Sequence, residues 1–120
     1  MEVFKEFRFE AAHRLPNVPP SHKCYGLHGH SFRIRVYVAG PVSPETGFVV
    51  DFAEIKQGMT PLLEELDHQL LNDIDGLQNP TTENLARWVW RRLSGTLHSL
   101  SRLEVWETPT SGCVYSGEDD

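Results

Sequence analysis

The sequence predicts an α+β domain in which an antiparallel sheet packs against a pair of helices. Two segments, residues 51–66 and the stretch after Pro80, repeat apolar residues every three or four positions, as helices with one buried face do. Four other segments alternate apolar and polar residues, the period of a half-buried strand: 3–11, 31–39, 101–107 and 113–116. The resulting order, β-β-α-α-β-β, favours a four-stranded antiparallel sheet with the helix pair on one face.

Each of the two long strands has one apolar face. In the first strand this face consists of Val3, Phe7, Phe9 and Ala11. In the second strand it consists of Phe32, Ile34, Val36 and Val38. The connecting loop is rich in proline and glycine, which interrupt regular structure. Residues 41–47 are predicted to form a turn and residues 48–50 a brief extended stretch.

Helix starts are marked by capping residues. Asp51 can cap the first helix, and Glu54 three residues later completes a capping-box pattern. Either Thr81 or Thr82 can cap the second helix. The buried stripes are predicted to be Phe52, Ile55, Met59, Leu62 and Leu66 in the first helix, and Leu85, Val89 and Leu93, with Trp88 nearby, in the second. The segment between the helices, 67–80, is predicted to be irregular.

Length and composition limit the possible classes of protein. A chain of 120 residues, 39% of them apolar, suits one domain spanning residues 1–120 with its own core. The formal net charge of −6 argues against a nucleic-acid partner, which would require a basic face. No apolar run approaches the roughly 18 residues of a membrane helix, and the N-terminus lacks the pattern of a signal peptide. We therefore expect a cytoplasmic protein without a membrane partner, whose two cysteines are thiols.

Three histidines are candidates for metal ligands. In a strand, residues two apart point to the same side, so His28 and His30 share the apolar face of Phe32. His13 has the parity of Phe9 and also points inward. Three neutral imidazoles bind zinc well and leave a fourth coordination position open. The alternative is that these are ordinary core or surface histidines held by hydrogen bonds.

Cys24 lies four residues before His28, in the proline-rich loop. A thiol near a metal or an imidazole has a lowered pKa and can act as base or nucleophile. It could equally be a small buried hydrophobic residue, or a fourth zinc ligand that would close the site and make it structural.

Two further groups of residues suggest acid–base chemistry or ligand binding. Asp67 can hold His68 in one tautomer, which suits a general acid or base, although a solvated pair at a helix end is equally compatible with the sequence. Glu107 has the parity of Leu103 and Val105, so its carboxylate must be paired. A ligand with an N–C–N edge, such as a pterin, would pair with it through two hydrogen bonds. A salt bridge or an exposed strand end is the alternative.

Several motifs together resemble the 6-pyruvoyl-tetrahydropterin synthase family over nearly the whole chain. They are Phe9-Glu10-Ala11-Ala12-His13-Arg14-Leu15, Cys24-Tyr25-Gly26-Leu27-His28-Gly29-His30, Val50-Asp51-Phe52, Leu66-Asp67-His68, Leu71-Asn72-Asp73, Asn79-Pro80-Thr81-Thr82-Glu83-Asn84 and Glu107-Thr108. The Cys-x3-His-Gly-His spacing resembles the bacterial 6-carboxytetrahydropterin synthases of queuosine biosynthesis, whereas the pyruvoyl-forming animal enzymes have a longer gap.

The resemblance implies a role for each site residue. His13, His28 and His30 match the zinc ligands, and Cys24 matches the catalytic cysteine. Asp67 and His68 match the acid–base pair. Glu107 matches the carboxylate that anchors the pterin, and Thr81 and Thr82 align with a segment that lines the pterin pocket. Arg8, Arg14 and Lys23 are candidates for phosphate contact.

The resemblance also implies a fold, an assembly and a reaction. The fold is the tunnelling fold, in which sheets of three subunits close a barrel and two trimers stack into a hexamer with sites between subunits. The reaction converts 7,8-dihydroneopterin triphosphate into 6-carboxy-5,6,7,8-tetrahydropterin, acetaldehyde and triphosphate, with Zn²⁺ as cofactor. The alternatives are formation of 6-pyruvoyl-tetrahydropterin, or a non-catalytic zinc- or pterin-binding module.

Overall fold

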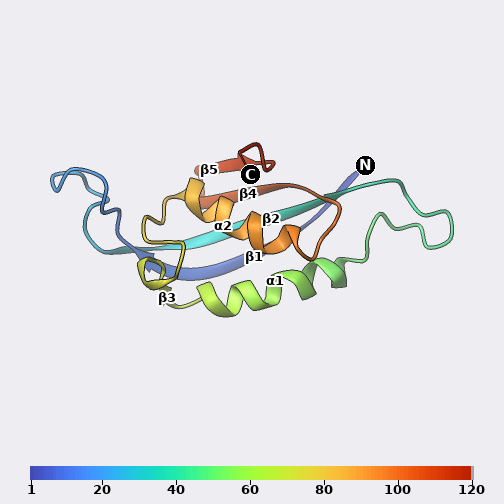
Figure 1. Cartoon of the computed structure of the whole chain (residues 1–120), viewed down its shortest axis with the longest axis horizontal. Helices are drawn as coiled ribbons and strands as arrows, with labels where there is room; N and C mark the ends of the chain where they lie inside the picture. The colour runs from blue at the N-terminus through green and yellow to red at the C-terminus, as the bar shows by residue number, and fades with distance from the viewer. Residues whose placement is uncertain (120) are drawn as a thin grey trace.

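The computed structural model describes residues 1–119, an elongated domain of 57 × 25 × 25 Å (Figure 1). Its elements, in chain order, are β1 (Glu2–His13), β2 (His28–Ala39), α1 (Phe52–Leu66), β3 (Gln69–Leu70), the 3₁₀ turn η1 (Leu71–Asp73), α2 (Thr82–Ser94), β4 (Leu100–Thr108) and β5 (Ser111–Tyr115). The loops 14–27 and 40–51 project from opposite ends of the long β1–β2 pair (Figure 1). None of the helices in the described part of the chain is long and apolar enough to span a membrane.

The sheet has five strands in the order β3-β1-β2-β4-β5, and this corrects the expected four-stranded antiparallel sheet. The additional strand β3 runs parallel to β1, pairing Ala11 with Gln69 and Ala12 with Leu70. Two residues are too few to show an alternating pattern, so the sequence could not reveal it. The backbone N–H of His68 donates to the carbonyl of Glu10 at 2.6 Å, which docks the start of β3 against β1.

One hydrophobic core lies between the sheet and the two helices. The alternation of β1 and β2 is confirmed, since Phe9 and Ile34 are buried on the helix-facing side. The stripes of both helices are also confirmed, with one exception: the Phe52 side chain is 52% exposed, because it stands in the first turn of α1, beside the loop. Residues 48–50 do not form a strand, and Val49 and Val50 lie in a bend.

Capping side chains start both helices. Asp51 accepts a hydrogen bond from the N–H of Ala53 at 2.9 Å, so it caps α1 as predicted. Of the two threonine candidates, Thr81 is the cap of α2: its hydroxyl accepts from the N–H of Asn84 at 3.1 Å. Thr82 is the first residue of the helix itself.

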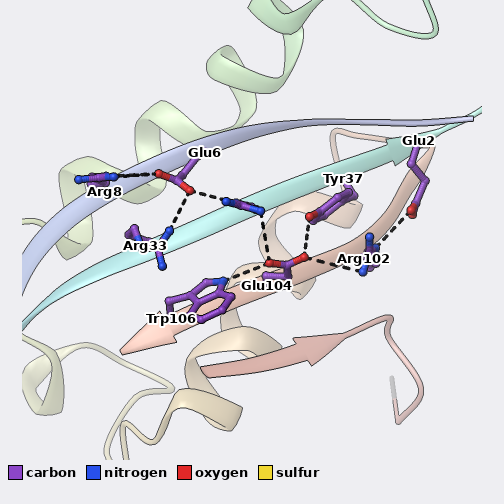
Figure 2. A network of polar contacts seen from close by, with 9 residues as sticks. Glu2, Glu6, Arg8, Arg33, Tyr37, Arg102, Glu104 and Trp106 are labelled. Carbon is purple, nitrogen blue, oxygen red and sulfur yellow. Dashed lines mark hydrogen bonds and ion pairs between the residues drawn. The ribbon is translucent and has the colours of Figure 1, made fainter. Parts of the chain in front are cut away.

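The other face of the sheet carries charged side chains that are paired with one another (Figure 2). Glu6 accepts hydrogen bonds from Arg8, Arg33 and Arg35 at 3.3, 3.2 and 3.0 Å. The bond from Arg35 is the main reason why the pKa of Glu6 lies below its ordinary value. Glu104 forms a second centre on the same face, joined by Tyr37, Arg102 and Trp106 in Figure 2. The helices thus cover the apolar face, and a connected ionic network occupies the opposite one.

Candidate metal centre

Strand pairing brings the three predicted histidines together at one end of the sheet. In the β1–β2 ladder His13 stands opposite His28, and Ala11 stands opposite His30. The His13 side chain is fully buried, and the other two are partly buried. One ligand atom from each residue lies within 4.8 Å of the others. The parity argument from the sequence is therefore confirmed, because both strands run without a bulge up to these residues.

Backbone carbonyls fix the orientation of two of the rings. His13 donates from Nδ1 to the carbonyl of Pro80 at 2.9 Å, and His28 donates from Nδ1 to the carbonyl of Gly26 at 2.7 Å. In a neutral imidazole, the nitrogen that carries no hydrogen presents a lone pair. The Nε2 atoms of His13 and His28 lie 3.1 Å apart, so two lone pairs face each other there. That arrangement is favourable only with a proton or a metal ion between them.

The third imidazole supports the same conclusion. Nε2 of His30 is buried and has no hydrogen-bond partner among the described residues. Burial lowers the pKa of His13 and of His30, although the carboxylate of Glu107 opposes the shift in both cases. The two rings therefore stay neutral to a lower pH than an ordinary histidine does. Buried neutral imidazoles with inward lone pairs are what a divalent metal of the zinc type requires, and the residues present fit such an ion.

Glu107 lies beside the histidines. Its Oε1 atom is 3.2 Å from Nε2 of His13 and 3.3 Å from Nε2 of His30. The expectation that this carboxylate faces inward is thus confirmed, but with neutral imidazoles neither contact is a salt bridge. Its assignment to a pterin remains a prediction.

Cys24 occupies the loop between β1 and β2, and its thiol is free. The carbonyl of Cys24 accepts from the N–H of Leu15 at 3.0 Å, and its N–H donates to Nδ1 of His22 at 3.0 Å. These bonds fold the loop back beside the end of β1. The group of mutually close metal-ligand atoms in the described chain contains the histidines and not Cys24. The structure therefore does not make the thiol a fourth ligand.

Asp67 and His68 form the predicted pair. Nδ1 of His68 lies 3.0 Å from Oδ2 of Asp67, and Oδ1 of Asp67 accepts from the N–H of Glu10 at 2.9 Å. The bond from Glu10 is the main cause, and His68 the next, of a pKa of Asp67 below its ordinary value. The His68 backbone has φ of 59°, a conformation uncommon for residues with a side chain, and its ring is 77% exposed. The ring is thus held by a carboxylate yet open to a ligand.

Two pockets meet at His30. The first, of about 540 Å³, includes His68 and Glu10 in its lining, and the second, of about 550 Å³, includes Glu107, Arg8 and Arg33. Both are also lined by Gly29, His30 and Ser31. Within one chain, His68 and Glu107 therefore line different pockets that share His30.

The remaining predicted residues, apart from Arg8, do not line either pocket. Thr81 follows Pro80, whose carbonyl holds His13, and its hydroxyl is used by the helix cap. The carbonyl of Thr82 accepts from the thiol of Cys113 at 3.6 Å. Among the phosphate candidates, Arg8 lines the second pocket, whereas the Arg14 guanidinium stacks on Tyr25.

Sequence reasoning missed the groups that hold the ligands in place. They are the carbonyls of Pro80 and Gly26, and the side chain of Asn72, which bonds the backbone of Arg14 directly after His13. A carbonyl has no residue-type signal, because every residue carries one. Arg33, which also lines the second pocket, was not among the predicted site residues.

Comparison with known proteins finds relatives along nearly the whole chain. The family model described as 6-pyruvoyl tetrahydropterin synthase matches residues 2–118. The chain is 46% identical over 119 residues to the 6-carboxy-5,6,7,8-tetrahydropterin synthase of Synechocystis, covering 94% of this chain and 91% of the relative. It is 32% identical over 133 residues to the human 6-pyruvoyl tetrahydrobiopterin synthase, covering 98% and 92%.

A solved structure confirms the expected fold class. The 6-pyruvoyl tetrahydropterin synthase of Caenorhabditis elegans superposes with a TM-score of 0.90 at 28% identity, covering 98% of this chain and 96% of that one. The likeness extends over both helices and the sheet, and it supports the tunnelling fold that the sequence resemblance implied. The chain therefore belongs to the 6-pyruvoyl tetrahydropterin synthase family.

Proposed function

We propose that this chain is a zinc-dependent 6-carboxytetrahydropterin synthase, a carbon–carbon lyase of queuosine biosynthesis. Its reaction would convert 7,8-dihydroneopterin triphosphate into 6-carboxy-5,6,7,8-tetrahydropterin, acetaldehyde and triphosphate. The observation that carries the proposal is the group of three histidines with mutually close ligand atoms, together with the Cys-x3-His-Gly-His spacing that includes the free Cys24. The relative from Synechocystis with that name supports the choice of reaction.

The metal would be held by His13, His28 and His30. When bound, zinc supplies Lewis-acid polarisation of the substrate's side-chain oxygens, which makes the neighbouring C–H groups more acidic. The protein contributes the dry, fixed ligand set: Pro80 and Gly26 hold two rings in the tautomer that directs Nε2 inward.

Proton transfer would fall to Cys24 and His68. The Cys24 thiolate would remove or relay a proton from the side chain of the substrate. His68, with its Nδ1 paired to Asp67, would return a proton from Nε2. Asp67 suits this role because its pKa is depressed, so it remains ionised and stabilises the charged ring.

Substrate orientation would come from Glu107 and the α2 start. The carboxylate would accept two hydrogen bonds from the N–C–N edge of the pterin. Thr81 and Thr82 would line the pterin pocket through the backbone next to Pro80. Arg8 lines the same pocket as Glu107, which favours it among the candidates for phosphate contact.

Association of several copies would complete the site. In one chain, His68 and Glu107 line different pockets. The outer strand β5 and most of β1 present free sheet edges, which association removes. We propose a hexamer of two stacked trimers, in which Cys24 and the Asp67–His68 pair reach one site from different copies. The proposed location is the cytoplasm, whose reducing conditions suit two free cysteines.

Mass spectrometry of the products tests the reaction. The zinc-loaded protein is incubated with 7,8-dihydroneopterin triphosphate, and we expect 6-carboxytetrahydropterin, acetaldehyde and triphosphate in equal amounts. Formation of 6-pyruvoyl-tetrahydropterin without acetaldehyde would favour the second candidate, which the human relative suggests. Stoichiometric metal without release of triphosphate would indicate a binding module.

A pair of cysteine variants tests the mechanism. Cys24→Ala should abolish turnover while one zinc per chain is retained. Cys113→Ala is the matched control, because that thiol packs against α2 and donates to the carbonyl of Thr82. Loss of zinc in Cys24→Ala would instead support a closed structural site.

A further inference from the structure

Glu107 lies beside two of the three histidines. Its Oε1 atom is 3.2 Å from Nε2 of His13 and 3.3 Å from Nε2 of His30, and its side chain is 25% exposed. It comes from the end of β4, whereas the histidines belong to β1 and β2. The carboxylate therefore closes the histidine group from a third strand.

Hydrogen bonding between these groups does not explain the contact. His13 gives its Nδ1 hydrogen to Pro80, so in the neutral ring Nε2 carries a lone pair. An ionised carboxylate carries only lone pairs as well. Nε2 of His30 lies 3.3 Å from the same oxygen, yet it has no hydrogen-bond partner among the described residues. Acceptors gathered around one point repel each other unless a cation lies between them.

The separations match those of ligands that share one ion. With bonds of about 2.0–2.1 Å, the corners of a tetrahedral zinc site lie about 3.3 Å apart. The separations here are 3.1 Å between His13 and His28, and 3.2 and 3.3 Å from Glu107 to His13 and His30. The compact ligand group contains the histidines alone, so Glu107 stands at its rim, and rotation of its side chain would place an oxygen on the ion.

We propose that Glu107 is the fourth metal ligand of the substrate-free protein and leaves the metal when a pterin binds it. One carboxylate cannot hold an ion and give both oxygens to the N–C–N edge of a pterin. Pterin binding would therefore free a coordination position for the substrate side chain. The departure of Glu107 on pterin binding rests on the proposed function, whereas the binding of Glu107 to the metal does not.

Cobalt replacement provides a readout that is independent of turnover. The protein is loaded with Co²⁺, whose visible absorption reports the number and kind of its ligands. Glu107→Gln keeps the size of the side chain and removes the anionic ligand. We expect an altered cobalt spectrum and a zinc affinity, measured by chelator competition, that is lower by at least about tenfold. Glu64→Gln, on the exposed side of α1, is the matched control and should change neither.

A second variant shows whether a loss of zinc affinity comes from the missing carboxylate or from unfolding of the protein. Glu107→Asp retains the carboxylate on a shorter side chain and should give an intermediate zinc affinity. If Glu107→Gln still binds one Co²⁺ per chain with the wild-type spectrum and affinity, the ligation proposal is wrong.

Pterin without a side chain tests the exchange, because it offers the N–C–N edge but no hydroxyls to bind the metal. Adding it to the cobalt protein should shift the wild-type spectrum towards that of Glu107→Gln and leave the variant spectrum unchanged. An unchanged wild-type spectrum at saturating pterin would overturn the exchange. Neither result depends on product formation, so failure of the proposed reaction would be recognised separately.

Discussion

Replacing Asn72 by alanine should destabilise the fold by about 2 kcal/mol and weaken metal binding. Asn72 Oδ1 accepts from the N–H of Arg14 at 3.0 Å, and Nδ2 donates to the Arg14 carbonyl at 2.8 Å. Each of these bonds contributes about 1 kcal/mol. A third contact, from Nδ2 to the carbonyl of Gln78, is 3.4 Å long and adds little. Because Arg14 is exposed, water replaces the lost partners and no large desolvation cost is added.

The expected loss of metal affinity follows from the position of Arg14 in the chain. Arg14 directly follows His13, so the two bonds fix the backbone beside a ligand. We expect a loss of zinc affinity of up to about tenfold, as for other groups that position ligands.

Urea unfolding of the metal-free protein measures the change in the free energy of unfolding. Asn72→Asp keeps the acceptor for the Arg14 N–H but turns a carboxylate oxygen towards the Arg14 carbonyl, so its cost should be at least as large as that of Asn72→Ala. Asn17→Ala is the control. Asn17 is exposed in the loop 14–27, which begins at Arg14, and its replacement should have little effect. A loss below about 0.5 kcal/mol in Asn72→Ala, or equal losses in Asn72→Ala and Asn17→Ala, would refute the reasoning.

Three further predictions concern the cap, the thiols and the acid–base pair. Thr81→Ala should lower the free energy of unfolding in urea by about 1 kcal/mol because the cap of α2 is lost. Thr81→Ser should retain most of the stability that the cap provides. A loss in Thr82→Ala as large as that in Thr81→Ala would contradict the cap assignment. Burial raises the pKa of Cys113 to about 11, so at pH 8 a thiol reagent should modify Cys24 first and Cys113 only slowly until the protein is unfolded; equal rates would contradict this. The pKa of Asp67 is depressed by the Glu10 N–H and by His68, so its contribution to stability is present above the pKa of the unfolded chain and is lost as the pH falls through the lower folded value. A carboxyl NMR titration should show this depression, and His68→Gln should reduce it without abolishing it.

Strand parity explains why the sequence could predict that the three histidines come together. Residues two apart in a strand share a face, so apolar neighbours reveal which way a histidine points. For His28 and His30 the inference needed only that β2 begin at His28, and the ladder does begin there. The same rule placed Glu107 on the inward face from the parity of Leu103 and Val105.

Other features had no pattern to detect. The strand β3 has two residues, and its place beside β1 depends on contacts of Asp67 and His68 with Glu10. Thr81 and Thr82 have equal capping propensity, and only the hydrogen bond to Asn84 distinguishes them. These choices depend on backbone geometry, which composition does not encode.

The sequence by itself determined the order of the long elements, their buried faces and which three histidines come together, because each follows from local periodicity. Only the tertiary structure decided which groups surround those histidines. The carbonyls of Pro80 and Gly26, the oxygen of Glu107 and the fifth strand come from segments distant in the chain or from backbone atoms common to all residues. Their positions become defined only when the sheet and the helices pack around a single core, so no local sequence pattern predicts them.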